Sequence, residues 1–243
     1  MIVHESDIPC FKQLQSIIEE DISNGVYKIG DKLPSENALC RRYGVSRTTV
    51  RQALNQLLQK DLVYSIHRKG TFVKIPELNH ELSTVVSFAN VLQTSGLNGY
   101  TKITVRSTKA YDPTAAQYLG QRYSGLSLLG FAKGAPIVYY ESFIKDEYRD
   151  AVFAQAEELE SQKKPFSTYD IYWALGKRIS HIHQKLHAIR ADDRLAEIFL
   201  RPADPPVLIR LDSVYYDEND EPMECKTAYY RADVYSFELK REA

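Results

Sequence analysis

The sequence predicts an α+β protein with two domains, an N-terminal winged helix-turn-helix and a larger domain built on an antiparallel sheet. Residues 33–73 have the pattern of two short helices, a tight turn between them and two short strands. Residues 101–239 alternate strand and helix patterns around hairpin turns. Residues 75–80 (IPELNH) break both patterns. We therefore expect one domain at residues 1–75, a linker at residues 76–82 and a second domain at residues 83–243.

The composition agrees with two unlike domains. The 243 residues are 44% hydrophobic, enough for a sizeable core, and carry a net charge of −1. This small charge hides an asymmetry, because residues 26–74 hold ten Lys or Arg against three acidic residues, a local charge of +7 that leaves −8 elsewhere. A basic domain attached to an acidic one is expected to bind a polyanion at one end only.

The three cysteines, Cys10, Cys40 and Cys225, are odd in number and far apart, which predicts free thiols in a reducing compartment. No apolar run approaches the roughly 18 residues that a membrane span needs. The N-terminus lacks the basic start and apolar segment of a secretion signal. We expect a cytoplasmic protein without membrane association.

Three helices are expected in the first domain. Apolar residues at helical spacing between Pro9 and Gly25 predict the first. The second begins after the N-cap Ser35 and ends at Gly44, and Ser46 caps the third after a turn of two residues. Apolar residues one and two turns apart make a continuous stripe on the third helix: Val50, Ala53, Leu54, Leu57 and Leu58. That stripe must face a core.

The opposite face of the third helix is polar and basic. It carries Arg47, Thr48, Arg51, Gln52 and Asn55. Arginine can bond a guanine edge through two donors, glutamine or asparagine an adenine edge, and threonine a thymine methyl or a phosphate. Short strands at residues 62–64 and 71–73 flank a basic tip at residues 66–70, as in a winged helix. Two arginines alone would fit solvated helix charges, but the turn, the stripe and the basic tip together favour entry into a major groove.

Three sequence motifs in this region resemble those of the DNA-binding domain of the GntR family of bacterial transcription regulators. They are Leu33-Pro34-Ser35-Glu36, the run YGVSRTTVRQAL from Tyr43 to Leu54, and Gly70-Thr71-Phe72-Val73. The resemblance implies DNA contacts at Ser35, Arg41, Ser46, Arg47, Thr48, Thr49 and Arg51, and at Arg68, Lys69 and Gly70 of the tip. The family tip usually reads glycine, basic residue, glycine, whereas this chain has Arg68 at the first glycine position. An arginine there can enter a narrow minor groove electrostatically.

The second domain is expected to contain five helices and seven strands. The helices end near Ser95-Gly96, open at Asp112-Pro113, lie near residues 152–159 and 167–175, and run from Asp192 or Asp193 to Phe199. The strands lie at residues 101–106, 126–131, 137–144, 177–189, 207–216 and 223–230, and the last is a short strand near 234–239. Turns at residues 133–136 and 217–220 join two of the strand pairs into hairpins, which predicts an antiparallel sheet.

Most of residues 80–240 resemble the UTRA effector-binding domain, which accompanies the GntR module in the HutC subfamily and shares the chorismate lyase fold. The similar phrases are Ser87-Phe88, Gly134-x-Pro136 before Glu141-Ser142-Phe143, Ser167-x-Tyr169, and Glu221-Pro222-Met223-Glu224 before Tyr229-Tyr230-Arg231-x-Asp233. Such domains bind a small metabolite, often a sugar phosphate, and release DNA when they do. The resemblance implies an effector site at Ser87, Phe88, Glu141, Ser167, Glu224 and Tyr230.

Two departures from the family pattern change the expected effector. The family often has phosphate-gripping arginines in the strand before the Gly-x-Pro turn, but residues 126–132 contain none. The family acid four residues after that proline is replaced by Tyr140, with Glu141 next, and a one-residue shift moves a side chain to the other face of a strand. Either the register shifts or Tyr140 replaces the acid. A non-phosphorylated polar effector is favoured, although Glu224 by itself also fits an exposed strand position.

Three histidines of the expected strand at 177–189 share one face. His181, His183 and His187 could offer nitrogens to a metal, but no carboxylate or cysteine accompanies them at ligand spacing, and Lys185 lies on the same face. We expect no metal and no cofactor.

Together these patterns predict a homodimeric transcription regulator, a repressor in preference to an activator, that binds an inverted-repeat DNA operator. Its effector is expected to be a sugar, a sugar phosphate or a related polar compound. Two alternatives stay open. The second domain could be a lyase-like enzyme, although Ser87, Glu141 and Glu224 form no recognisable nucleophile and base set. It could instead only dimerise or dock a partner, with its own aromatic residues filling the interior.

Overall fold

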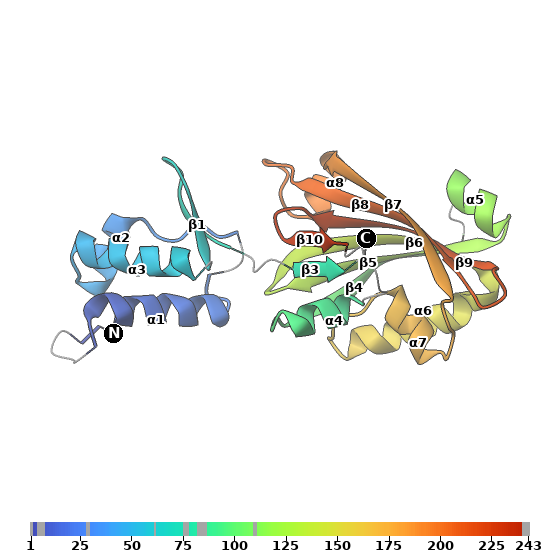
Figure 1. Ribbon diagram of the computed structural model, residues 1–243, viewed down its shortest axis with the longest axis horizontal. Coiled ribbons are helices and arrows are strands. Elements are labelled where there is room, and N and C mark those ends of the chain that lie inside the picture. Colours follow the sequence, from blue (N-terminus) through green and yellow to red (C-terminus); the bar gives the residue numbers. More distant parts are fainter. Residues whose placement is uncertain are drawn as a thin grey trace, which may run out of the picture. The chain divides into compact units, whose positions relative to one another are not determined.

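The computed structural model describes residues 2–3, 8–27, 30–60, 62–74, 78–81, 87–108 and 111–239. The chain divides into two compact units, Met1–Pro76 and Glu77–Ala243 (Figure 1). Each unit has its own buried core, and each is treated separately below.

The first unit is a three-helix bundle with a two-stranded wing. Its elements are α1 (Cys10–Ser23), α2 (Glu36–Tyr43), α3 (Arg47–Gln59), β1 (Val63–Ile66) and β2 (Gly70–Val73). Four of the five stripe residues of α3 are buried and the fifth, Leu58, is partly buried. The stripe packs with apolar residues of α1, α2 and both strands, among them Leu14, Ile18, Leu39, Val63 and Val73. The winged helix-turn-helix predicted for this part of the chain is confirmed.

Local capping explains why α2 and α3 begin where they do. The Ser35 hydroxyl accepts a hydrogen bond from the Ala38 amide (3.3 Å), and the Ser46 hydroxyl accepts one from the Thr49 amide (3.1 Å). Between the helices, Gly44 adopts a left-handed conformation (φ 66°) that ends α2. These three residues therefore fix the tight turn that orients α3.

Replacing Ser46 by alanine should destabilise the first unit by about 1 kcal/mol, because the Thr49 amide loses its cap. Hydrogen exchange of the α3 amides in the full chain should then be about fivefold faster where these amides exchange through opening of this unit. Asn37→Ala, an exposed position inside α2, is the matched control and should leave exchange in α3 unchanged. Unchanged exchange in S46A would contradict the capping role.

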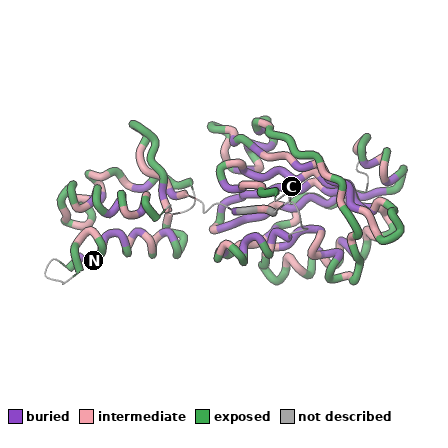
Figure 2. The backbone as a smooth tube through the Cα atoms, in the orientation of Figure 1, coloured by how far each residue is buried: buried purple, intermediate pink, exposed green. Residues whose placement is uncertain are grey.

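The second unit is built on a six-stranded antiparallel sheet with the strand order β4-β5-β6-β9-β8-β7. Its strands are β4 (Gly99–Ser107), β5 (Tyr123–Ala132), β6 (Ala135–Lys145), β7 (His181–Arg190), β8 (Val207–Tyr216) and β9 (Pro222–Arg231). The central strands β5, β6 and β9 are buried along nearly their whole length, whereas the edge strand β7 is largely exposed (Figure 2).

Helices cover both faces of this sheet. Along one face lie α4 (Phe88–Thr94), α6 (Asp146–Ser161) and α7 (Thr168–Ala174), and on the other lie α5 (Pro113–Leu119) and α8 (Asp193–Ile198) (Figure 1). We name these the α7 face and the α8 face. The α8 face has two apolar clusters, one under each helix, centred on Tyr123 and Val214 and on Tyr139 and Leu208. The predicted α+β domain on an antiparallel sheet is confirmed.

Two details differ from the sequence-based expectation. Residues 78–81, expected to lie in the linker, form β3 (Leu78–Glu81), which pairs in parallel with β10 (Tyr235–Glu238). The strand is too short and polar to show an alternating pattern, and its pairing with a segment more than 150 residues away fixes it. Helix α6 begins at Asp146, ahead of the expected start near residue 152, with Asp146 and Glu147 in its first turn. No helix in the described part of the chain is long and apolar enough to cross a membrane.

Candidate functional site

The exposed face of α3 gathers the residues that the sequence assigned to DNA. Arg47, Thr48, Arg51, Gln52 and Asn55 are all exposed, because the buried stripe holds the other side of the helix against the core. This face presents hydrogen-bond donors and acceptors at the N-terminal end of the helix, where a recognition helix meets base edges.

The neighbouring residues have supporting positions. Ser35, Ser46 and Thr49 lie at the helix starts, where Ser35 and Ser46 are caps and the Ser46 and Thr49 hydroxyls are 2.9 Å apart. Arg41 is exposed in the last turn of α2. The sequence reasoning missed Glu36, whose carboxylate accepts hydrogen bonds from Arg51 Nε at 3.0 and 3.1 Å. Glu36 therefore holds the guanidinium of Arg51 across the two helices.

The chain reverses direction at the wing tip, where Arg68 has a left-handed backbone conformation. Arg68 has φ 60° and Gly70 has φ 121°, and the Lys69 amide donates to the Ile66 carbonyl at 3.0 Å. Arg68 thus keeps a left-handed backbone, the conformation that glycine adopts most readily, although it carries a side chain. Below the tip, Tyr64 and Phe72 stack across the two strands with ring centroids 5.6 Å apart. At the tip of the wing, Arg68 and Lys69 are both exposed.

Arg68→Gly should stabilise the first unit by up to about 1 kcal/mol, because a left-handed L residue is disfavoured by roughly 1–2 kcal/mol and the chain entropy of glycine offsets part of that gain. Hydrogen exchange of the wing amides in the full chain should become slower. Lys69→Gly, at the adjacent residue outside the left-handed region, should not slow it. Faster exchange in R68G would show that the turn does not strain Arg68.

A buried ionic cluster lies on the α7 face of the second unit. Glu224 and Lys226 on β9 are 0% and 6% exposed, and Thr168 of α7 joins them. The Lys226 ammonium donates to Thr168 Oγ1 at 2.9 Å, and this hydroxyl donates to Glu224 Oε1 at 2.8 Å. The Lys226 ammonium also lies 4.2 Å from the centroid of the Tyr215 ring. A carboxylate, a hydroxyl and an ammonium thus form a directed chain in the interior.

Several buried polar atoms beside this chain have no hydrogen-bond partner among the described residues. They are Glu224 Oε2, Ser142 Oγ, Tyr172 OH, His80 Nδ1 and Tyr235 OH. Burial, and then the nearby Glu224 charge, raises the pKa of Tyr172 well above 10.0, so this hydroxyl stays protonated beside the carboxylate. Ser142 lies directly opposite Lys226 across β6 and β9, so it shares the α7 face. Buried polar groups are nearly always hydrogen-bonded in folded proteins. These atoms are the positions in the second unit where a bound polar molecule would find hydrogen-bond partners.

Aromatic side chains surround the polar atoms. Tyr230 lies in edge contact with Tyr140, His80 and Tyr235, at centroid separations of 6.1, 5.7 and 4.8 Å. Burial raises the pKa values of Tyr140, Tyr215 and Tyr235 well above the usual value of 10.0, so these hydroxyls stay protonated. Burial, and then the charge of Lys226, lowers the pKa of His80 from 6.5 to about 4, so this imidazole is neutral near pH 7. We refer to these residues with Glu224, Lys226, Thr168 and Ser142 as the α7-face cluster.

The structure brings together only part of the predicted effector site. Glu224 and Tyr230 belong to the α7-face cluster, and Phe88 is buried against Gly130, where a Cβ atom would lie 2.7 Å from the phenyl ring. Ser87 and Ser167 are buried helix starts: the Ser87 hydroxyl accepts from the Asn90 amide, and the Ser167 hydroxyl and amide donate to Asp170. Both serines thus have capping roles.

Glu141 does not join the other predicted effector residues. It points to the α8 face, where Arg194 Nη1 donates to its carboxylate at 2.7 Å, and its neighbour Tyr140 lies in the α7-face cluster. The predicted alternative in which Tyr140 takes the position of the acid agrees with this geometry. The sequence reasoning overlooked Thr168, Lys226 and His80. Only Thr168 had a signal, since it lies between the two residues of the Ser167-x-Tyr169 phrase.

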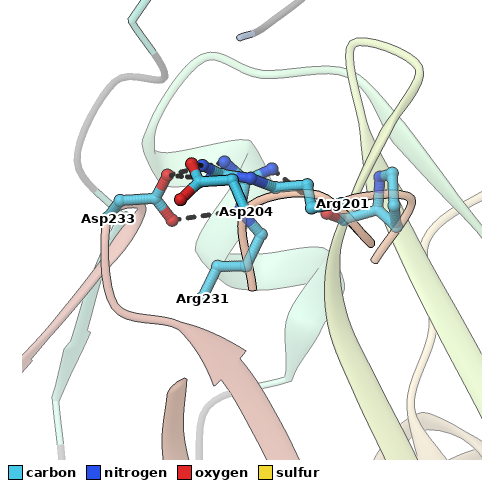
Figure 3. A network of polar contacts seen from close by, with 5 residues as sticks. Arg201, Asp204, Arg231 and Asp233 are labelled. Carbon is cyan, nitrogen blue, oxygen red and sulfur yellow. Dashed lines mark hydrogen bonds and ion pairs between the residues drawn. The ribbon is translucent and has the colours of Figure 1, made fainter. Parts of the chain in front are cut away.

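A network of ion pairs lies at the C-terminal end of β9. Asp233 accepts hydrogen bonds from Arg231 at 2.7 and 3.0 Å and from Arg201 at 3.2 Å, while Arg201 also donates to Asp204 at 2.5 Å (Figure 3). Arg231 is buried, and its Nη1 reaches the Pro136 carbonyl at 3.4 Å. The arginines lower the pKa of Asp233 although burial acts in the opposite direction. The network ties the turn before β10 to the segment after α8.

The α8 face carries a separate open cleft of about 230 Å³. Its charged lining residues include His183, Lys185, Arg210 and Asp212, and Asp212 already accepts hydrogen bonds from Arg210 (2.8 Å) and Thr227 (2.9 Å). The histidines considered for a metal diverge, since His181 lies 3.4 Å from Asp220 and His187 lies 3.6 Å from Asp212. Within the described residues, no three His, Cys, Asp or Glu side chains converge on a metal position.

Comparison with known proteins agrees with both halves of this description. Residues 11–73 match the model of the family described as bacterial regulatory proteins, gntR family, and residues 95–236 match the UTRA domain model. The fold is shared with the crystal structure of PhnF from Mycobacterium smegmatis, at a TM-score of 0.63 and 21% identity over 94% of this chain and 99% of that one. A winged helix followed by a UTRA domain defines a two-domain bacterial regulatory protein.

Two curated relatives are similar in sequence. YurK of Bacillus subtilis, described as an uncharacterized HTH-type transcriptional regulator, is 42% identical over 96 residues, 40% of each chain. The present chain thus spans about two fifths of the length of YurK. The transcriptional repressor NagR of Bacillus subtilis is 27% identical over 96% of this chain and 95% of its own. The chain belongs to the GntR family of regulators and carries a UTRA domain, the arrangement of the HutC subfamily.

Proposed function

We propose that the protein is a transcription repressor that binds an inverted-repeat DNA operator as a homodimer and leaves it when a small polar effector occupies the second unit. The observation that carries the proposal is the exposed α3 face, where Arg47, Thr48 and Arg51 stand clear of the core beside a basic wing. As a regulator that acts on operator DNA, the protein is proposed to work in the cytoplasm. The name of NagR as a repressor supports the direction of control.

The effector is proposed to bind at the α7-face cluster, without turnover. Glu224 Oε2 and Ser142 Oγ are buried without partners among the described residues, which supports a bound polar molecule there. His80 belongs to the same cluster and lies on β3, the first strand after the wing strand β2 along the chain. An effector shifts the equilibrium only by its different affinities for the DNA-bound and released forms. An effector that contacts β3 would bind with different affinity to the DNA-bound and released forms if the position of β3 differs between them.

Arg47→Ala tests the DNA reading directly. The full-length protein is used to select a duplex from a random library, and affinities are then measured on this duplex and on random DNA. R47A should weaken binding to the selected duplex by about 1–3 kcal/mol with little effect on random DNA, because it removes a base-edge contact.

Arg41→Ala is the matched control for this test. As a phosphate contact it should weaken binding on both duplexes equally and reduce the slope of affinity against salt by about one. An equal loss on both duplexes in R47A would exclude base reading by Arg47. Selection of no duplex by the wild-type protein would refute the proposed function itself.

A further inference from the structure

We infer that Glu36 is a specificity-determining residue of the DNA-binding face, which orients Arg51 toward a guanine edge and withholds it from the phosphates. The inference rests on the proposed function, since it assigns a positioning role within the same α3 face. It follows from the ion pair between α2 and α3, and from the donors of Arg51 that this pair leaves unused.

The ion pair uses one donor of the guanidinium. Both carboxylate oxygens of Glu36 lie within hydrogen-bonding distance of Arg51 Nε, at 3.1 and 3.0 Å. The four N–H groups on Nη1 and Nη2 have no acceptor among the described residues. Recognition of guanine O6 and N7 by an arginine requires two such donors side by side. Glu36 therefore holds Arg51 by Nε and leaves the terminal pair of nitrogens available for a base edge.

The carboxylate itself has a fixed position. Glu36 is the first residue of α2 and follows the N-cap Ser35, so it lies at the electropositive end of that helix, where a negative charge is favoured. The left-handed Gly44 ends α2 and sets the tight turn into α3. The side chain of Glu36 is 38% exposed and that of Arg51 66% exposed, so the arginine reaches beyond its partner toward solvent. Glu36 thus acts as an anchor on one helix for a base-reading side chain on the next.

Arg47 provides the contrast. It lies one helical turn before Arg51 on α3, is exposed, and has no ion-pair partner among the described residues. Its guanidinium can turn to a base or to a phosphate as the DNA requires. Arg51 cannot turn to a phosphate without leaving Glu36, because its Nε is already bound. The ion pair therefore makes Arg51 the more selective of the two arginines.

The charge of Glu36 opposes binding to DNA in general. It is the only acidic residue of the sequence between Lys32 and Lys60. A carboxylate on a surface that meets a polyanion lowers the affinity for any sequence. Exposed ion pairs contribute little to folding, whereas a charge-assisted hydrogen bond strengthens when DNA excludes water from it. A purely structural role and a positioning role therefore predict different effects of removing Glu36.

The test compares affinities of the full-length protein for the selected duplex, for duplexes with each base pair substituted in turn, and for random DNA. Arg51→Ala identifies the base pair at which discrimination is lost. Glu36→Ala should lower discrimination at that same base pair by about tenfold, because Arg51 is no longer oriented. E36A should also bind random DNA about two- to threefold more tightly, because a negative charge leaves the interface.

Three further variants separate orientation from charge. Glu36→Gln keeps an oxygen that can accept from Arg51 Nε, so it should bind random DNA as tightly as E36A and yet retain most of the discrimination. The double variant E36A with R51A should discriminate no less than R51A alone. Glu20→Ala is the matched control, because Glu20 is an exposed glutamate on α1 and should leave discrimination unchanged.

Unchanged discrimination in E36A, or an equal loss in E20A, would overturn the role of Glu36 while the proposed function stands. Loss at a different base pair, or a further loss in the double variant, would show that Glu36 reads a base itself and does not position Arg51. If R51A loses discrimination at no base pair, Arg51 is not a base reader and the inference is wrong. Selection of no duplex by wild-type protein would refute the repressor function and this inference together.

Discussion

Replacing Lys226 by alanine should destabilise the second unit by about 3–5 kcal/mol, because it leaves a buried carboxylate without its counter-charge. Glu224 is completely buried. Its Oε1 atom lies 3.9 Å from the Lys226 ammonium, and the Thr168 hydroxyl forms hydrogen bonds with both side chains. The change also removes the ammonium packed on the Tyr215 ring. Urea unfolding followed by near-ultraviolet circular dichroism measures the loss, because the packed tyrosines of the second unit dominate this signal.

Two variants separate charge from packing. The double variant Lys226→Ala with Glu224→Gln removes both charges and should recover a substantial part of the stability, which makes the pair non-additive. Lys185→Ala removes an exposed lysine of β7 opposite Asp212 and should change stability by less than about 1 kcal/mol. A loss in K226A no larger than in K185A would show that Glu224 does not depend on Lys226.

The first unit could be predicted almost completely from its sequence because its signals are local. Ser35, Gly44 and Ser46 fix the helix boundaries through contacts no more than four residues away. The stripe on α3 likewise follows from spacing within one helix. Glu36 escaped notice because its contact with Arg51 spans 15 residues and joins two helices.

The effector region was less predictable because its contacts are distant in the chain. Thr168 meets Glu224 and Lys226 across 56 and 58 residues, so no local pattern indicates that a strand lysine is buried. The choice between Tyr140 and Glu141 depended on register, which a bulge between Gly130 and Phe131 of β5 adjusts near this point. The four residues of β3 become a strand only through their pairing with β10.

The second unit should lose about 3 kcal/mol of stability as the pH falls from 6.5 to 4, because His80 resists protonation in the fold. Burial and the nearby Lys226 charge lower its pKa from 6.5 to about 4. Between these values the unfolded chain binds a proton that the folded chain does not, so acid favours unfolding. The stability is fully present above pH 6.5 and is lost as the pH approaches 4.

His80→Phe is the direct test, since phenylalanine keeps an aromatic ring between Tyr230 and Phe237 without a titrating nitrogen. Urea unfolding of this variant at pH 7.0, 5.5 and 4.5 should show a flatter dependence than wild type, whereas His183→Phe, at an exposed position of β7, should keep the wild-type slope. The lowered pKa of Asp233 acts below its unfolded value of 3.8, outside this window. An unchanged slope in H80F would mean that His80 does not titrate abnormally. A flattened slope would show that His80 on β3 is a neutral imidazole in the folded protein. In the proposed function, an effector that forms a hydrogen bond with Nδ1 of His80 would then stabilise this position of β3.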